Sequence, residues 1–204
     1  MAYSNFTTIE QLTKELNIVP RYKTVFSDVK KIEPSEWLRT TLSFSDFVTT
    51  NNEKSKSESI VYPVLAEVVK LNDNKITIFS GSNLDADKER SLNGECDFII
   101  TENIGALTIE SSILQIVEAK DHNIKTGIPQ CAAQMLGAQI INEKNDAKID
   151  CIYGCVTTGD DWQFMKLYND KLCIDKKKYY INEIENILGV FQEIINYFEK
   201  SNNK

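Results

Sequence analysis

The sequence predicts an α/β fold in which helices cover both sides of a central sheet. Three observations lead to this prediction. The 204 residues fit a single domain with some elaboration. Apolar residues make up 42% of the chain and charged residues 26%, which is ordinary for a globular protein. The middle of the chain reads as a helix, three strands, a second helix and two strands.

The first part of the chain is expected to be helical. Thr8 is placed to cap a helix that ends before Pro20, and Ser35 is placed to cap a second helix. Residues 49–58, TTNNEKSKSE, are polar and lack periodicity, which predicts a loop or linker. We therefore assign residues 1–57 to a helical extension and linker.

Residues 58–168 contain the predicted core. Its expected elements are a buried helix at 59–71, strands at 75–80, 94–101 and 113–120, a helix that begins at KTGIPQ, and a hairpin of strands at 148–158 and 162–168. Residues 169–204 would add a short edge strand and a long amphipathic helix. The apolar stripe of that last helix is a candidate dimer seam or surface for a protein partner.

Composition limits the compartment and the partners. No apolar run approaches about 18 residues and no signal peptide is visible, so we expect a cytoplasmic protein with no membrane partner. Five cysteines without tight pairing also suit a reducing compartment. Cys151 and Cys155 lie in an apolar run, which favours buried strand residues over a metal pair. The single histidine directs attention to carboxylates, lysines and amides.

The run Glu118-Ala119-Lys120 ends the third predicted strand. An acid-x-lysine pattern is weak by itself, since five such patterns occur where chance predicts about three. Only the pattern at Glu118 lies within a strong strand and directly before a loop. Strand alternation would place Leu114, Ile116, Glu118 and Lys120 on one face. An acid and an ammonium beside apolar neighbours are costly unless paired or bound to a metal.

Asp97 is the second unusual charge, because it interrupts the strand CDFII. If the second and third strands pair, Asp97 and Glu118 can lie within reach of one ion. Two carboxylates and a backbone carbonyl suit Mg²⁺ or Mn²⁺. Lys120 would orient an attacking water and stabilise charge on a phosphate.

These residues resemble a known family. The run GECDFII at 94–100, followed by VEAK at 117–120 and by Gly127, Gln130 and Gln134, resembles the PD-(D/E)XK nuclease superfamily. The resemblance covers residues 58–168. It implies a restriction-endonuclease-like αβββαβ core with a mixed central sheet flanked by helices, and metal-dependent hydrolysis of DNA or RNA.

The resemblance also implies roles for individual residues. Asp97 and Glu118 would be metal ligands and Lys120 the catalytic lysine. Glu67, on the helix before the sheet, matches an acid that many members use as a further ligand. Gln130 matches a polar residue on the helix after the lysine strand. The residue before Asp97 is a cysteine and not the proline of the motif's name.

Three kinds of protein remain open. The first is a metal-dependent nuclease. The second is an inactive nuclease-fold binding module or a subunit of a defence or repair assembly. The third is a structural protein in which the carboxylates simply pair with lysines.

The net charge of −7 is unevenly distributed. Residues 59–169 hold 16 acidic and 9 basic side chains, whereas residues 1–58 and 170–204 are each neutral. An acidic chain binds polyanions poorly. We therefore expect nucleic-acid binding to depend on metal, on lysines of the neutral flanks or on a basic partner.

Overall fold

The computed structural model describes all residues except 1, 48–51, 74, 103–106, 110–111 and 203–204. Its α-helices are α1 (Ile9–Leu16), α2 (Glu36–Phe44), α3 (Glu53–Lys56), α4 (Tyr62–Leu71), α5 (Ile124–Lys144) and α6 (Ile184–Asn202). Its strands are β1 (Val19–Lys23), β2 (Thr77–Asn83), β3 (Glu95–Thr101), β4 (Ile113–Ala119), β5 (Ile152–Thr157), β6 (Asp161–Tyr168), β7 (Lys171–Asp175) and β8 (Tyr179–Tyr180). A π-helical turn, Ser57–Val61, joins α3 to α4.

The strands form one mixed, mostly antiparallel sheet in the order β1-β7-β6-β5-β4-β3-β2, with β8 beside β6. Two neighbouring pairs are parallel, β4 with β5 and β1 with β7. Parallel neighbours need a crossover, and α5 supplies the one between β4 and β5.

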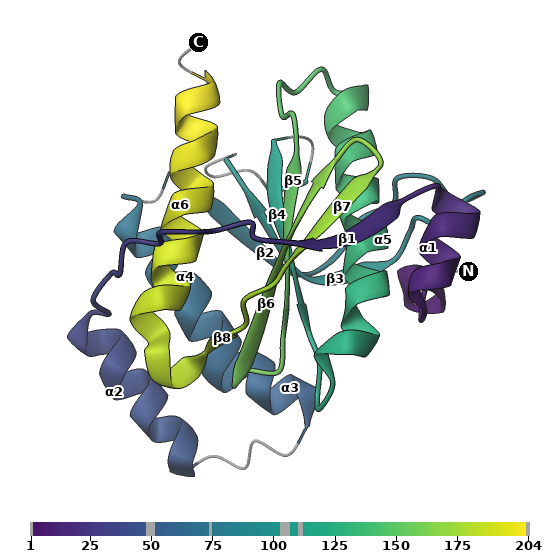
Figure 1. The fold of residues 1–204 in the computed structure, drawn as a ribbon. Helices are drawn as coiled ribbons and strands as arrows, with labels where there is room; N and C mark the ends of the chain where they lie inside the picture. The colour runs from purple at the N-terminus through teal and green to yellow at the C-terminus, as the bar shows by residue number, and fades with distance from the viewer. Residues whose placement is uncertain (1, 48–51, 74, 103–106, 110–111, 203–204) are drawn as a thin grey trace.

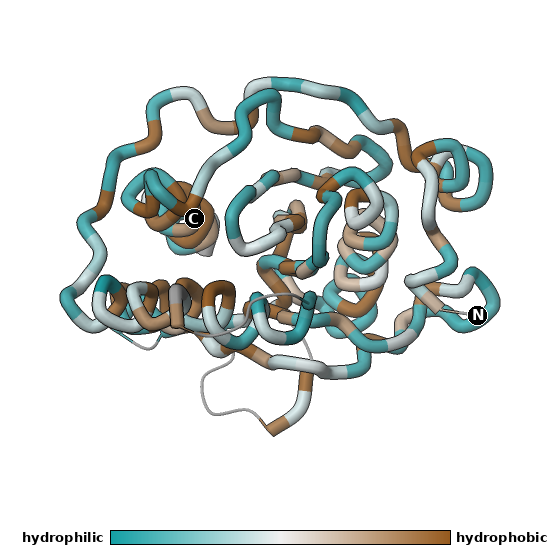
Figure 2. The backbone as a smooth tube through the Cα atoms, turned by 90° about the horizontal axis from the view of Figure 1, so that it is seen from below, coloured by the Kyte–Doolittle hydropathy of each residue, from teal (hydrophilic) through white to brown (hydrophobic). Residues whose placement is uncertain are grey.

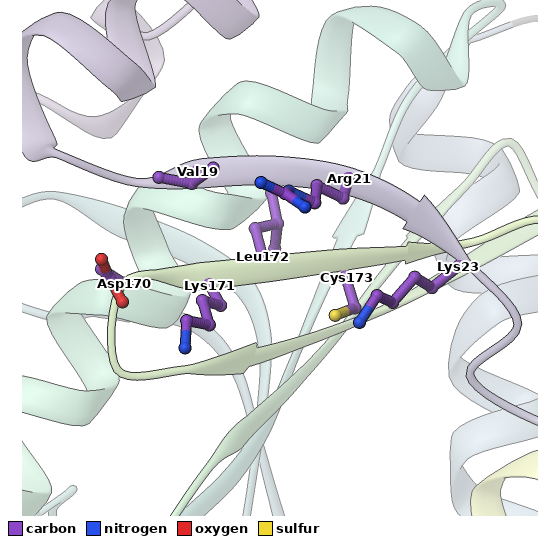
Figure 3. A pocket seen from close by; sticks show the side chains of 7 residues that line it. All are labelled: Val19, Arg21, Lys23, Asp170, Lys171, Leu172 and Cys173. Atoms are coloured by element: carbon purple, nitrogen blue, oxygen red, sulfur yellow. The ribbon is translucent and has the colours of Figure 1, made fainter.

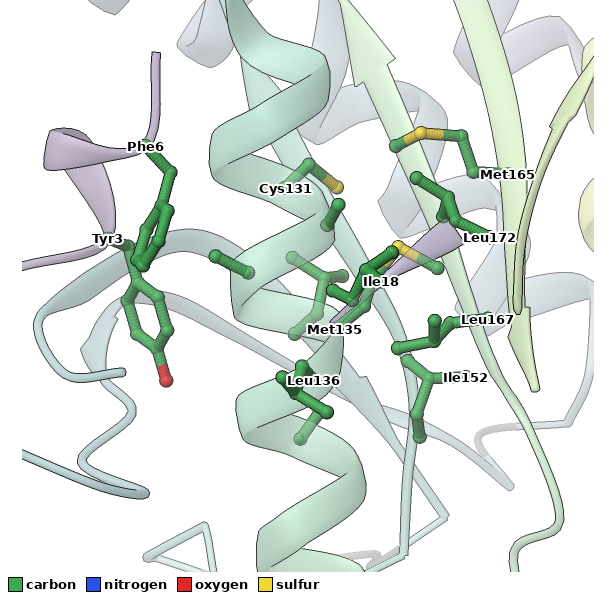
Figure 4. Packing of buried hydrophobic residues seen from close by; sticks show 14 of the residues in the cluster. Tyr3, Phe6, Ile18, Cys131, Met135, Leu136, Ile152, Met165, Leu167 and Leu172 are labelled. Atoms are coloured by element: carbon green, nitrogen blue, oxygen red, sulfur yellow. The ribbon is translucent and has the colours of Figure 1, made fainter. Parts of the chain in front are cut away.

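Helices cover both faces of the sheet, as predicted (Figures 1 and 2). Buried residues of α1 and α5 form one hydrophobic cluster with the strands. Those of α2, α4 and α6 form the other. Figure 4 shows α5 packed between Tyr3 and Phe6 on one side and Leu167 and Leu172 of the strands on the other.

The expected order of helix, three strands, helix and strand is present as α4, β2–β4, α5 and β5. Two predicted caps are also confirmed. Thr8 forms a capping box with Gln11, and the Ser35 side chain accepts a hydrogen bond from Leu38 N. Cys151 and Cys155 are buried and unbonded to each other, as expected for packing residues.

The prediction that the first part is helical is confirmed for α1 and α2 but missed the strand β1 between them. β1 lies at the edge of the sheet and pairs in parallel with β7, so Val19 is opposite Lys171. The residues of β1 are mostly exposed and include Pro20, so they lack the alternation that marks a half-buried strand. The N-terminal segment therefore completes the sheet instead of only extending it.

The predicted loop at 49–58 was also wrong for its second half. Asn52 caps α3 by accepting a hydrogen bond from Ser55 N, and helical structure then continues through the π turn into α4. Residues 49–51 lie outside the described part. Four polar residues of this second half, Glu53, Lys54, Ser57 and Glu58, line a cleft.

The last helix is part of the core and not an exposed seam. Its apolar side chains are buried against the sheet. They are Ile184, Ile187, Leu188, Phe191, Ile194, Ile195 and Phe198. This burial removes the basis for the predicted dimer seam.

The predicted single face of β4 was wrong at Leu114. Leu114 packs in the cluster of α4 and α6, while Ile116 packs in the cluster of α5. The pairing register between β3 and β4 shifts at this point, since Ile100 is opposite Gln115 whereas Thr101 is opposite Ile113. Such a bulge reverses the alternation beyond it.

Among the helices that the structure describes, none has the length and apolar character needed to cross a bilayer.

Candidate active site

Asp97 and the end of β4 are joined by a direct hydrogen bond. β3 and β4 are antiparallel, with Phe98 opposite Val117. One step further, the Asp97 carboxylate reaches the backbone after Glu118, and Ala119 N donates to Asp97 Oδ2 at 2.7 Å. The pairing of two strands that are adjacent in sequence thus brings together the two acids that the sequence singled out.

Glu118 is almost fully buried, at 1% exposure, and both of its carboxylate oxygens accept hydrogen bonds. Lys120 Nζ donates to Oε1 at 2.6 Å, and Gln134 Nε2 donates to Oε2 at 2.7 Å. A buried carboxylate requires such partners, because removing it from water is otherwise very unfavourable.

The two carboxylates influence each other's protonation. Burial and, next, the nearby charge of Asp97 raise the pKa of Glu118 to about 7, against the opposing effects of Lys120 and Gln134. Burial also raises the pKa of Asp97, opposed mainly by the hydrogen bond from Ala119 N. A cation shared by the two groups would offset this repulsion and favour their ionised forms.

Lys120 follows β4 directly and keeps its charge. Burial by itself would lower the pKa of its ammonium, but the charges of Glu118, Glu53 and Asp97 together raise it. Its backbone N donates to Thr157 O at 2.8 Å, which fixes the residue against β5. Its side chain lies so close to α5 that a Cβ added at Gly127 would stand 2.9 Å from Lys120 Cγ.

A cleft of about 510 Å³ opens beside these groups. Its walls come from α3 and the π turn on one side and from β2, β3 and the end of β4 on the other. The lining residues are Glu53, Lys54, Ser57, Glu58, Ser80, Gly81, Glu95, Asp97 and Ala119. Asp97 therefore faces a space large enough for solvent or part of a substrate.

Glu53 is a site residue that the sequence did not predict. Its Oε2 lies 3.8 Å from Lys120 Nζ, and its side chain lines the cleft with Asp97. α3 is held there by Lys56, whose Nζ donates to Asp121 O at 2.8 Å. One sequence signal for α3 was Asn52, a residue type that commonly caps helices. A second was spacing, because steps of three and four residues lead from Glu53 to the apolar face of the next helix.

Glu67 is not brought to this cluster. It is fully buried, and its Oε1 and Oε2 accept hydrogen bonds from Ser35 N at 2.7 Å and Ser35 Oγ at 2.8 Å. Its carboxylate thus anchors the first turn of α2. The predicted set of Asp97, Glu118 and Glu67 as metal ligands does not assemble, because no three His, Cys, Asp or Glu side chains in the described part of the chain are grouped to hold a metal.

Gln130 lies on α5, the helix after the lysine strand, and its role in the site stays a prediction. It is half-buried and forms no side-chain hydrogen bond with any residue that the structure describes. Gln134, one helical turn later, is fully buried and donates to Glu118. Gln130 and Gln134 are four residues apart and so share one face of α5. Of the two, Gln134 is the glutamine that reaches Glu118.

The remaining carboxylate pair suits a divalent cation. Mg²⁺ is commonly held by one or two carboxylates while it keeps several waters. Asp97 supplies one carboxylate at the cleft and Glu118 another at the same strand ends, and the two disfavour each other's ionisation. These residues fit Mg²⁺ or Mn²⁺ without a third acidic ligand.

Comparisons with known proteins found little similarity. No protein-family model matches the chain, and no curated protein matches it. Among solved structures, the chain is similar to the type IIG restriction endonuclease BpuSI, with 18% sequence identity and a TM-score of 0.46. The similarity covers 89% of this chain and 18% of that protein.

Proposed function

We propose that this protein is a metal-dependent phosphodiesterase of the PD-(D/E)XK type that hydrolyses DNA or RNA. The observation that carries the proposal is the convergence of Asp97, Glu118 and Lys120 at the adjoining ends of β3 and β4, beside an open cleft. The order of α4, β2–β4, α5 and β5 also agrees with the core that this superfamily uses.

Asp97 and Glu118 would hold one Mg²⁺ or Mn²⁺. When bound there, the cation would supply Lewis acidity toward a phosphate oxygen and make an attacking water easier to deprotonate. Gln134 and Lys120 fix the Glu118 carboxylate, and Ala119 N fixes that of Asp97, so both ligands are oriented before any cation arrives.

Lys120 would act on the substrate through its ammonium. Its raised pKa keeps it protonated at neutral pH, so it can donate to a phosphate oxygen and position the attacking water. The attacking water forms a new P–O bond and releases a proton to solvent, the bond to the leaving oxygen breaks, and that oxygen takes up a proton from solvent. Glu53, across the cleft, is placed to balance the ammonium when no substrate is bound.

The proposal is tested by nucleic-acid cleavage with Mg²⁺ or Mn²⁺. Lys120→Ala is expected to lower the cleavage rate by about 10²–10³-fold, the usual effect of removing a group that stabilises transition-state charge. Lys125→Ala, an exposed lysine in the first turn of α5, is the matched control and should cleave like the wild type. Unchanged cleavage by folded Lys120→Ala would rule out the assigned role of Lys120.

A second candidate is a nuclease-fold binding module without turnover. It is favoured by the fact that both Glu118 oxygens already accept hydrogen bonds from within the protein. In that case the protein binds nucleic acid, and no cleavage appears with either metal at any pH at which Glu118 is ionised.

A further inference from the structure

A second cleft lies far along the sheet, at its β1 edge. β1 and β7 come from the two ends of the chain and pair in parallel, which places Arg21 opposite Cys173. Figure 3 shows the side chains that line the cleft on these strands. Its volume is about 360 Å³. Its lining residues are Val19, Arg21, Lys23, Asp170, Lys171, Leu172 and Cys173, and we call them the edge groove.

The edge groove is cationic in an acidic protein. Arg21, Lys23 and Lys171 line it, against the single carboxylate of Asp170. None of these three cations has a carboxylate of the described residues within ion-pair distance, whereas Lys120, Lys56 and Lys178 each have at least one. The groove therefore presents positive charge that the fold leaves unneutralised.

More cations continue from the groove toward the carboxylate site. The exposed run Lys176–Lys178 follows β7, and Lys176 N donates to Lys23 O at 3.0 Å. Lys178 Nζ lies 3.6 Å from Asp161, the first residue of β6, and Lys56 reaches Asp160 in the turn just before it. Lys56 also contacts Asp121, the residue after Lys120.

We propose that the edge groove binds the phosphate backbone of nucleic acid, as an anchoring surface separate from Asp97 and Glu118. The choice of nucleic acid among polyanions rests on the proposed function. Arginine and lysine gain affinity for a phosphate chain by releasing its condensed counterions. The acidic cleft repels that chain, so binding must draw on cations elsewhere, and the edge groove gathers them from both neutral flanks.

The first test measures DNA binding without turnover. A fluorescent duplex of about 20 base pairs, long enough at ~3.4 Å per base pair to span groove and cleft, is titrated at low salt in EDTA. Arg21→Glu/Lys171→Glu is expected to weaken binding at least tenfold. The slope of the logarithm of the binding constant against the logarithm of salt concentration should also become less steep by about 2, since two phosphate contacts are lost.

The matched control is Lys14→Glu/Arg90→Glu, which makes the same change of net charge at two exposed cations outside the groove. It should bind clearly better than the groove variant. Equal affinity of the two variants would overturn the proposal, because only total charge would then matter. Since EDTA prevents metal-dependent cleavage, loss of binding in the groove variant supports this surface even if the wild type proves unable to cleave.

The second test locates the bound chain. Cys173 is half-buried in the groove, while the other four cysteines are buried, so N-ethylmaleimide should modify Cys173 first. Saturating duplex is expected to slow that modification, and inorganic phosphate at the same phosphate concentration is not. Equal protection by inorganic phosphate would mean that the groove is a site for small anions and not a surface for the nucleic-acid backbone. No protection by the duplex would contradict the assigned location.

Discussion

Glu118 shows at the scale of one residue how burial and pairing compete. Desolvation favours its neutral form, while Lys120 and Gln134 favour its carboxylate, and the balance leaves its pKa near 7. A structural ion pair gains nothing from this balance. A metal ligand gains from it, because a bound cation can supply the stabilisation of the carboxylate that the protein provides only in part.

This balance predicts a pH dependence of stability. The folded-state pKa of about 7 lies above the ordinary value of 4.5, so the native state binds the proton more tightly than the unfolded chain. The resulting stabilisation is complete below about pH 4.5 and is lost as the pH rises through about 7. Urea unfolding of metal-free protein across this range should show a decline in unfolding free energy of roughly 3 kcal/mol from Glu118.

Glu118→Gln should remove most of that decline, and Glu89→Gln, at an exposed acid, should leave it in place. The raised pKa of Asp97 adds a decline of the same sign that Glu118→Gln leaves behind. An identical pH profile for the wild type and Glu118→Gln would mean that Glu118 is not the buried group with the raised pKa.

Gly127 is the second residue on which the site depends. A Cβ there would stand 2.6 Å from Val156 Cγ1 and 2.9 Å from Lys120 Cγ, so Lys120 or the helix must move. Gly127→Ala should lower the unfolding free energy by about 1–3 kcal/mol, because overpacking exceeds the gain in helix propensity. Cleavage should fall as well, while Lys125→Ala changes neither. Wild-type stability and cleavage in Gly127→Ala would show that α5 does not position Lys120.

Among the elements, α3 matters because it carries Glu53 over the cleft. Its attachment is Lys56, whose side chain is 14% exposed and donates to Asp121 O. Lys56→Met keeps the apolar stem but leaves that carbonyl without its donor, which should cost about 1–3 kcal/mol of unfolding free energy. Lys54→Met on the same helix is the control, since Lys54 is 84% exposed and its ion pair with Glu58 contributes little.

Amide hydrogen exchange distinguishes a local from a global effect of Lys56→Met. Faster exchange confined to residues 53–61 is expected, because Lys56 attaches one short helix to the loop after β4. Exchange in this segment that matches the Lys54→Met control would show that Lys56 does not hold α3 in place.

The elements differ in how far the sequence predicts them. Helices with strong caps and buried strands were found, because Thr8, Ser35 and the apolar run before Glu118 carry local signals. β1 was missed because it is short and exposed, and because its pairing depends on β7, far away in sequence. α3 was missed because its amphipathic character is visible only together with the helix that follows.

The candidate site divides in the same way. Asp97, Glu118 and Lys120 belong to neighbouring strands, so their approach follows from sequence order and strand pairing. Gln134, Glu53 and Glu67 come from helices whose depth and rotation are set by packing, which no short motif records. Tertiary structure therefore decides which polar helix residue reaches Glu118.

Across the whole molecule, charge is separated by the order of the strands. The acidic excess belongs to residues 59–169, which hold the central strands and the carboxylate pair. The neutral flanks meet at the sheet edge as β1 and β7 and expose their cations there. Under the two proposals above, one sheet would hold a cation at the adjoining ends of β3 and β4 and bind an anion at its β1 edge.

The most direct test of a metal-dependent site is Mn²⁺ titration by calorimetry at about pH 8, above the pKa of Glu118. The wild type should bind Mn²⁺, and Asp97→Asn should bind it at least tenfold more weakly. Asp28→Asn, at an exposed carboxylate, should bind like the wild type. Equal Mn²⁺ binding by folded Asp97→Asn, or no Mn²⁺ binding by the wild type, would contradict the assignment of Asp97 and Glu118 as a metal site.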